Sequence, residues 1–184
     1  MARCYSVRMR QRQSLPALWL LSDQRNDAGI EAALKRLPRG SGFIFRHYHL
    51  KPDERHARFV QLARLARARG HRIVLSGTAR EARAWGADGA YGPPERLTRG
   101  PALLRLATAH DLREIAAGHR ARADAMLLSP AFPTRSHPSG KTLGPLRFRL
   151  LAARALVPAI ALGGMNRARA ARLRWRNWAA IDGI

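Results

Sequence analysis

Two loops in the second half of the sequence carry residue types suited to binding an anion. The apolar run Ala125–Leu128 leads into the hydroxyl-rich segment Ser129-Pro-Ala-Phe-Pro-Thr-Arg-Ser-His137. The apolar run Ala159–Leu162 leads into Gly163-Gly164, where glycine lets a ligand approach backbone N–H groups closely. Parallel α/β folds build anion sites from such loops at the C-terminal ends of strands.

The glycine pair is also followed by a predicted helix, whose N-terminal dipole favours an anion. We therefore interpret Gly163 and Gly164 as part of a phosphate site. The alternative is that they serve only a tight turn.

The ends of the other predicted strands add polar side chains but few carboxylates. This composition suits a phosphorylated or aromatic small molecule better than hydrolysis by two carboxylates. The predicted partner is therefore a phosphorylated small molecule. The predicted substrate-binding residues are Tyr48, Ser76, Thr108, His110, Thr134, Ser136, Gly163, Gly164, Asp182 and Gly183.

Arg46 and His137 are the predicted catalytic residues. Arg46 shares a strand face with Ile44 and Tyr48 by the two-residue alternation of strands, so its guanidinium would lie among apolar layers. A buried guanidinium needs an anionic partner. An acidic side chain of the protein and a ligand phosphate are the alternatives, and we favour the ligand. His137 follows the hydroxyl-rich loop and suits an acid, a base or a phosphate partner, or else it is a solvated loop residue.

His47 and His49 form an H-x-H pattern that is able to chelate a transition metal. A third ligand at fixed spacing is missing from the sequence. We therefore interpret both as ordinary polar histidines and predict no metal ligands.

Length and composition indicate one domain of 184 residues, with a basic tail over residues 1–14 and a single domain over residues 15–184. Cys4 is the only cysteine, which excludes an internal disulfide and a cysteine-based zinc site and favours a cytoplasmic setting. No apolar run approaches the roughly 18 residues that span a membrane, so we predict no membrane partner.

The net charge of +22 arises from 34 basic and 12 acidic residues and suggests contact with polyanions. The arginines are nevertheless spread over every predicted helix. The chain shows no C₂H₂ spacing, no aromatic RNP-like strand and no obvious helix-turn-helix. We predict no specific nucleic-acid partner, only incidental binding of polyanions.

Short apolar runs alternate with amphipathic stretches along the chain, which is typical of a parallel sheet covered by helices. The predicted strands are Leu18–Leu21, Gly42–Arg46, Arg72–Leu75, Gly89–Tyr91, Ala102–Leu106, Ala125–Leu128, Pro158–Leu162 and Trp178–Ile181. The predicted helices are Gly29–Leu37, Pro52–Arg69, Ala79–Trp85, Asp111–Arg120, Gly144–Leu156 and Arg167–Arg174.

Eight strands predict a closed α/β fold, a (β/α)₈ TIM barrel that is compact because typical barrels have ~250 residues. Prolines leave little room for a helix between Tyr91 and Ala102, and none follows Ile184. A barrel without its last helix would expose apolar surface. The N-terminal tail or a second subunit would cover it, so a homo-oligomer is a further expectation.

Three motifs resemble signatures of the thiamine phosphate synthase family and its thiazole tautomerase-like relatives. They are Gly86-Ala-Asp-Gly89, Ser129-Pro-Ala-Phe-Pro-Thr134 and Ala161-Leu-Gly-Gly-Met165, in the family's order and spacing. The resemblance covers nearly the whole chain, from Leu18 to Gly183.

The resemblance implies a (β/α)₈ barrel that joins hydroxymethylpyrimidine diphosphate to a thiazole phosphate and releases pyrophosphate. In the family, magnesium and basic residues help the diphosphate to leave, and a stabilised pyrimidine cation remains. By resemblance Arg46 would hold the diphosphate. The thiazole phosphate would be held by Thr134, Ser136, Gly163 and Gly164.

The resemblance also leads to an expectation of Mg²⁺, whose ligands are not recognisable in this sequence. Ser76-Gly77 stands where the family has Asn-Asp, and the second carboxylate position falls near Arg96. His137 replaces a lysine, although Lys141 lies four residues later. The histidine of the tautomerase branch is also missing from the loop that begins at Ser129.

Three functions are consistent with these observations. The first is a transferase resembling thiamine phosphate synthase. The second is a non-catalytic or altered relative that binds a phosphorylated thiazole or pyrimidine. The third is a basic protein associated with nucleic acid, and we favour the first.

Overall fold

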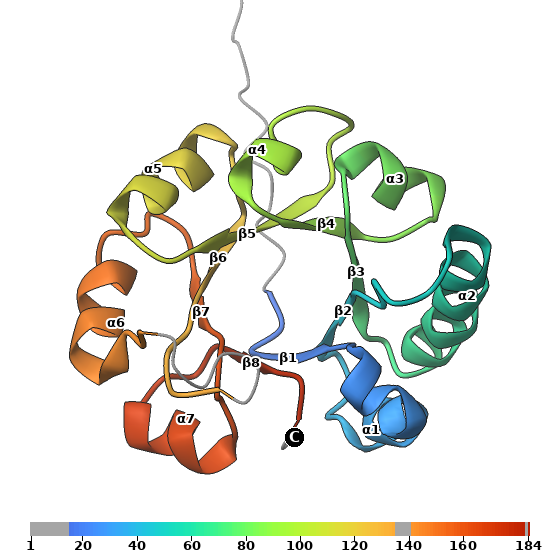
Figure 1. Ribbon diagram of the computed structural model, residues 1–184, viewed down its shortest axis with the longest axis horizontal. Coiled ribbons are helices and arrows are strands. Elements are labelled where there is room, and N and C mark those ends of the chain that lie inside the picture. The colour runs from blue at the N-terminus through green and yellow to red at the C-terminus, as the bar shows by residue number, and fades with distance from the viewer. Residues whose placement is uncertain (1–14, 135–140, 183) are drawn as a thin grey trace, which may run out of the picture.

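The computed structural model describes residues 15–134, 141–182 and 184, and its strands close into one parallel barrel (Figure 1). Each strand pairs in parallel with the next, and β8 pairs with β1. The (β/α)₈ prediction is confirmed. The strands are β1 (Leu18–Leu21), β2 (Gly42–Phe45), β3 (Arg72–Ser76), β4 (Gly89–Gly92), β5 (Leu104–Ala109), β6 (Ala125–Leu128), β7 (Ala159–Ala161) and β8 (Trp178–Ala180).

Helices surround this barrel on its outer side (Figure 1). A 3₁₀ helix, η1 (Gln24–Gly29), precedes the first of them. The α-helices are α1 (Ile30–Arg36), α2 (Pro52–Ala68), α3 (Ala79–Ala84), α4 (Pro94–Leu97), α5 (Leu112–Arg120), α6 (Gly144–Ala152) and α7 (Arg167–Leu173). In the described part of the chain no helix follows β8, as predicted, and α7 and α1 flank the gap in Figure 1.

Two predictions between β4 and β6 need correction. A one-turn helix, α4, does fit between Tyr91 and Ala102, because Pro94 takes the first helical position, where a missing N–H costs nothing. Strand β5 begins at Leu104 and continues to Ala109, later than the predicted Ala102–Leu106. Its extension carries Thr108 to the C-terminal rim of the barrel.

The barrel interior follows the two-residue alternation of its strands. Trp19 and Leu21 of β1 pack inside with Ile44, whereas Leu20 packs outside against the helices. The indole of Trp19 occupies the space beside Gly42, where a Cβ would lie 2.1 Å from the ring. Glycine at this point of β2 therefore lets one large ring fill the end of the barrel opposite the strand C-termini.

Side-chain caps start several helices directly after the strand ends. Asp111 accepts a hydrogen bond from the N–H of Glu114, and Asn166 accepts one from the N–H of Arg169 at 2.8 Å. These caps satisfy backbone donors at the first turns of α5 and α7. They also fix the side chains of the first turns beside the barrel rim.

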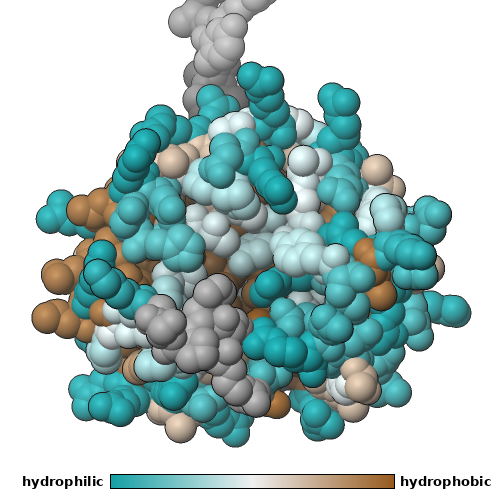
Figure 2. Space-filling model, viewed as in Figure 1, coloured by the Kyte–Doolittle hydropathy of each residue, from teal (hydrophilic) through white to brown (hydrophobic). Residues whose placement is uncertain are grey.

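The visible surface is largely hydrophilic, with one apolar area over α6 at the left of Figure 2. Leu146 and Leu150 of α6 and the nearby Leu156 are exposed. The described residues contain no helix that is long and apolar enough to cross a membrane. Formation of a homo-oligomer remains a prediction.

Candidate functional site

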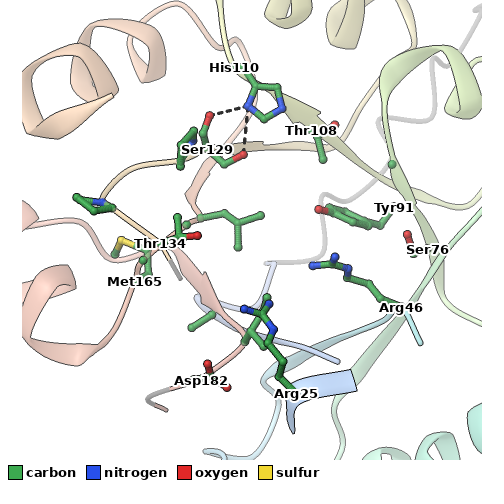
Figure 3. A pocket seen from close by; sticks show the side chains of 18 of the residues that line it. Arg25, Arg46, Ser76, Tyr91, Thr108, His110, Ser129, Thr134, Met165 and Asp182 are labelled. Atoms are coloured by element: carbon green, nitrogen blue, oxygen red, sulfur yellow. Dashed lines mark hydrogen bonds between the residues drawn. The ribbon is translucent and has the colours of Figure 1, made fainter. Parts of the chain in front are cut away.

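A cavity of about 990 Å³ opens at the C-terminal ends of the barrel strands (Figure 3). Ligands of (β/α)₈ barrels bind at this end. Among the described lining residues, five are cationic and only Asp182 is acidic, so the cavity suits an anion. The charged or polar side chains that line it are Arg25, Arg46, Tyr48, Ser76, Tyr91, Arg96, Thr108, His110, Ser129, Thr134, Lys141, Asn166, Arg169 and Asp182.

One carboxylate, Asp23, holds two of the cationic side chains at the ends of β1 and β2. Arg25 Nε lies 2.7 Å from Asp23 Oδ1, and Arg46 Nη2 lies 3.6 Å from Oδ2. The hydrogen bond from Arg25 lowers the pKa of Asp23 below its usual value. Both guanidinium groups point into the cavity in Figure 3.

Of the two partners that the sequence left open for Arg46, an acidic side chain and a ligand phosphate, the structure provides the acidic side chain, Asp23. The prediction that its guanidinium lies among apolar layers is wrong, because β2 ends at Phe45 and a quarter of the Arg46 side chain is exposed. The exposed part of the guanidinium faces the cavity, where it is available to a ligand.

A buried hydrogen-bonded chain fixes the backbone of Arg46. Its N–H donates to Ser22 Oγ at 2.8 Å, and Ser22 Oγ lies 2.7 Å from His47 Nδ1. His47 Nε2 lies 2.8 Å from Asp27 Oδ1. Burial lowers the pKa of His47, so the neutral imidazole is favoured. The Ser22 hydroxyl then donates to Nδ1, and Nε2–H donates to Asp27.

Asp27, His47 and His49 place three ligand atoms within 4.8 Å of one another, a grouping that the sequence did not reveal. However, Asp27 Oδ1 also accepts a hydrogen bond from Arg58 Nη2 at 2.6 Å, and both ring nitrogens of His47 are engaged. A guanidinium competes with a cation for the same carboxylate. We therefore retain the interpretation of ordinary polar histidines within an ion-pair network.

Arg55 of α2 joins the ends of β2 and β3. Its Nε donates to the Arg46 carbonyl at 3.0 Å and its Nη2 to the Ser76 carbonyl at 2.8 Å. Its Nη1 pairs with Glu81 at 3.1 Å, and the guanidinium lies 5.0 Å from the Trp85 ring centre. The Arg55 fork thus positions two residues whose side chains line the cavity.

Gly77, directly after β3, leaves space that the Glu81 carboxylate fills. A Cβ at residue 77 would lie 2.3 Å from Glu81 Oε2. The neighbouring Ser76 hydroxyl forms a short hydrogen bond with the Tyr48 hydroxyl. The Tyr48 ring lies under the Arg46 guanidinium, 5.4 Å from centre to Cζ. This part of the rim presents hydroxyl groups and a guanidinium to the cavity.

The loops after β6 and β7 form the opposite wall and pack closely together. Phe132 N–H donates to the Gly163 carbonyl at 3.1 Å. Gly163 has φ +90° and its Cβ would lie 2.7 Å from Pro130 Cα. Gly164 has φ +62° and its Cβ would lie 2.4 Å from the Pro133 carbonyl oxygen. The glycine pair therefore serves a tight turn and close loop packing, and phosphate binding there remains a prediction.

Arg169 of α7 fastens the same two loops. Its Nη1 donates to the carbonyl oxygens of Gly164, at 2.5 Å, and Pro133, at 3.4 Å. Its guanidinium lies over the Phe132 ring, with Cζ 5.4 Å from the centre. Arg169 thus stabilises this wall through the N–H groups of Nη1.

His110 and Tyr91 face the cavity with groups that form hydrogen bonds. His110 Nδ1 lies 2.6 Å from the Ser129 carbonyl oxygen, which only accepts, so Nδ1 carries the hydrogen (Figure 3). Its Nε2 is then an acceptor in the neutral ring. Burial raises the pKa of Tyr91 to about 12, so the phenol stays protonated at neutral pH.

The structure brings nine of the predicted site residues together around this one cavity. They are Arg46, Tyr48, Ser76, Thr108, His110, Thr134, Gly163, Gly164 and Asp182. Ser136, His137 and Gly183 lie outside the described residues. The catalytic and binding roles of all twelve residues remain predictions.

Sequence reasoning did not place Arg25, Arg96, Lys141 or Arg169 among the site residues, although all four line the cavity. Two signals were available. Arg25 follows the polar end of β1 by only a few residues, and Arg169 lies three residues after the helix-capping Asn166. The many other arginines of the chain conceal both signals.

The described lining residues do not fit a magnesium ion. Mg²⁺ takes oxygen ligands and is held in proteins by one or two carboxylates. Asp182 is the only described acidic residue that lines the cavity. The hydrogen bond with Asp23 and, to a smaller extent, the charge of Asp182 raise the pKa of Arg25. The two positions where the resemblance places carboxylates hold Gly77 and a guanidinium from Arg96.

The closed sheet of eight parallel strands places the protein in the (β/α)₈ barrel class, and its cationic cavity lies at the C-terminal rim, where ligands of this class bind. The family model described as TMP-TENI, thiamine monophosphate synthase, matches residues 18–184. The chain therefore belongs to the thiamine monophosphate synthase family.

Solved structures agree with this fold. Thiamine phosphate pyrophosphorylase from Pyrococcus furiosus is 22% identical, with a TM-score of 0.75 over 91% of this chain and 86% of that chain. The Bacteroides thetaiotaomicron thiamine phosphate pyrophosphorylase is 14% identical, with a TM-score of 0.57 over 90% and 82%. No curated protein sequence is significantly similar to the chain.

Proposed function

We propose that this protein is a transferase that joins hydroxymethylpyrimidine diphosphate to thiazole phosphate. The observation that carries the proposal is a cavity whose described lining has five cationic side chains and one carboxylate. Family membership supplies the two substrates. The cavity supports them because both are anionic and because it is large enough for small-molecule ligands.

The reaction breaks the bond between the pyrimidine methylene carbon and the diphosphate oxygen, and the bonding electron pair leaves with pyrophosphate. The thiazole nitrogen then uses its lone pair to form the new carbon–nitrogen bond. Arg46 is in place to offset charge that develops on the leaving group. Hydroxyl groups of Tyr48, Ser76 and Tyr91 line the same side of the cavity.

The opposite wall is proposed to hold the thiazole phosphate. Gly163 and Gly164 donate no backbone hydrogen bond to another main-chain carbonyl in residues 15–134 and 141–182. Their N–H groups are therefore available to phosphate oxygens. Thr134 and Lys141 line this wall, and Ser136 and His137 belong to the segment between them. A cytoplasmic location is part of the proposal, since Cys4 is the only cysteine.

A second candidate is a barrel that binds these ligands without joining them. It is favoured by Gly77 and Arg96 at the two positions where the resemblance expects carboxylates. If charge on the leaving diphosphate is not offset, binding persists but the carbon–oxygen bond does not break.

The test mixes purified protein with both phosphorylated precursors and measures thiamine phosphate by chromatography. We expect product with the unaltered protein and a loss of rate of about tenfold or more in Arg46→Gln, because one charged donor is removed. Arg64→Gln, on the exposed side of α2, is the matched control with the same change in net charge. Absence of product, together with no binding of either precursor, would refute the proposal. A rise in melting temperature with thiazole phosphate but no turnover would support the second candidate.

A further inference from the structure

The rim of the cavity at β1, β2 and β4 carries three guanidinium groups, and the one at β4, from Arg96, stands where the resemblance expects a carboxylate. Arg25 follows β1, Arg46 follows β2, and Arg96 belongs to α4 after β4. All three line the cavity. A diphosphate bound here would meet three positive charges from one half of the barrel rim.

Two of the carboxylates near this rim, those of Asp23 and Glu81, are already engaged by arginine. Asp23 lies 2.7 Å from Arg25 and 3.6 Å from Arg46. Glu81, which occupies the space beside Gly77, pairs with Arg55 at 3.1 Å. Recruiting either carboxylate to a cation would break an ion pair and leave a guanidinium without its partner, which is costly in a partly buried site.

The same arrangement keeps guanidinium donors available to a ligand. Each guanidinium has five N–H groups, and Arg25 directs only its Nε at Asp23. Arg46 lies over the Tyr48 ring, which restricts its orientation without occupying an N–H group. Figure 3 shows both groups converging on the middle of the cavity. Planar guanidinium groups bind phosphate oxygens in pairs, with geometry that ammonium groups lack.

We propose that Arg25, Arg46 and Arg96 bind a diphosphate group directly and thereby take the place of a divalent cation. This inference rests on the proposed function for the identity of the diphosphate ester. In the transfer step the departing pyrophosphate carries away the electron pair of the broken carbon–oxygen bond. The three guanidinium groups offset that charge without a metal ion. Asp23 acts as a positioning residue for two of them.

Binding of inorganic pyrophosphate, measured by titration calorimetry, tests the inference without relying on turnover. We expect binding in EDTA, with no strengthening when Mg²⁺ replaces EDTA. Arg96→Gln is the main variant, because Arg96 is exposed on α4 and its replacement leaves the barrel core intact. It is expected to weaken pyrophosphate binding by about tenfold or more, and Arg46→Gln by a similar factor.

Arg64→Gln is the control for bulk electrostatics, because a chain of net charge +22 attracts any polyanion. We expect its affinity to change by less than about twofold, since a solvated charge far from the cavity is screened. Equal weakening in Arg64→Gln and Arg96→Gln would overturn the inference. So would binding that appears only with Mg²⁺, or no binding under either condition. The precursor-joining assay is run both in EDTA and in Mg²⁺. It therefore tests the proposed function whether or not the reaction needs a metal ion.

Discussion

Replacing Gly164 with alanine would impose two separate costs on the loop between β7 and α7. At φ +62° an alanine enters the left-handed region, which costs roughly 1–2 kcal/mol. Its Cβ would also lie 2.4 Å from the Pro133 carbonyl oxygen, more than 1 Å inside ordinary contact distance. Overpacking of this kind costs roughly 1–3 kcal/mol. The expected loss of unfolding free energy is therefore roughly 2–5 kcal/mol.

Gly40 provides the matched control, because it has φ +75° and no atom within 4 Å of a Cβ. Gly40→Ala should lose only the conformational part, roughly 1–2 kcal/mol. Thermal unfolding followed by circular dichroism resolves the difference, since about 2–4 °C corresponds to each kcal/mol in a chain of this size. Equal losses in the two variants would refute the packing argument and show that the β6 loop yields to Gly164→Ala without cost.

Three further substitutions test the framework of the site. Burial lowers the pKa of His47 in the folded state. As pH decreases below about 6.5, the unfolded state therefore takes up a proton on this side chain before the folded state does, and the free energy of unfolding should fall. In His47→Gln the free energy of unfolding, measured by urea titrations between pH 5 and 8, should depend less on pH. Part of the dependence should persist in both proteins, because burial also lowers the pKa of His71. An unchanged dependence would contradict the role given to His47. Arg55→Met should lose roughly 2–4 kcal/mol in denaturant unfolding, because two strand-end carbonyls lose charged donors, and full stability would disprove this role. Gly42→Ala should lose roughly 1–3 kcal/mol through contact with Trp19, and the same loss in Gly29→Ala, where the space is open, would argue against it.

The strands were predictable because both faces of a parallel barrel strand are covered, so each reads as a short apolar run. The runs Leu18–Leu21 and Ala125–Leu128 match β1 and β6 at both ends. Strand β5 was displaced because Thr108 is polar yet lies in the strand at the cavity. Helix α4 was missed because a single turn after Pro93 has no periodicity to detect.

The site was predictable only where residue type and strand end coincide, as at Ser76 and Gly163. Arg25 and Arg96 could not be distinguished from the many solvated arginines, because only the folded rim separates them. Asp23 pairs with both Arg25 and Arg46 because the C-terminal ends of β1 and β2 lie side by side. That distance cannot be read from the spacing of residues in the sequence. The partner of Asp27 was equally hidden, since Arg58 lies on a different helix.

The space beside Gly77 makes two positions of the rim interdependent. Any side chain introduced at residue 77 would meet the Glu81 carboxylate and displace it from Arg55. Arg55 would then be left to hold the carbonyls of Arg46 and Ser76 with an unbalanced charge. A new aspartate at residue 77 would therefore compete with Glu81 for one guanidinium. In evolutionary terms the substitutions at residues 77 and 81 are epistatic, and a lineage with this rim regains a carboxylate there only by changing both.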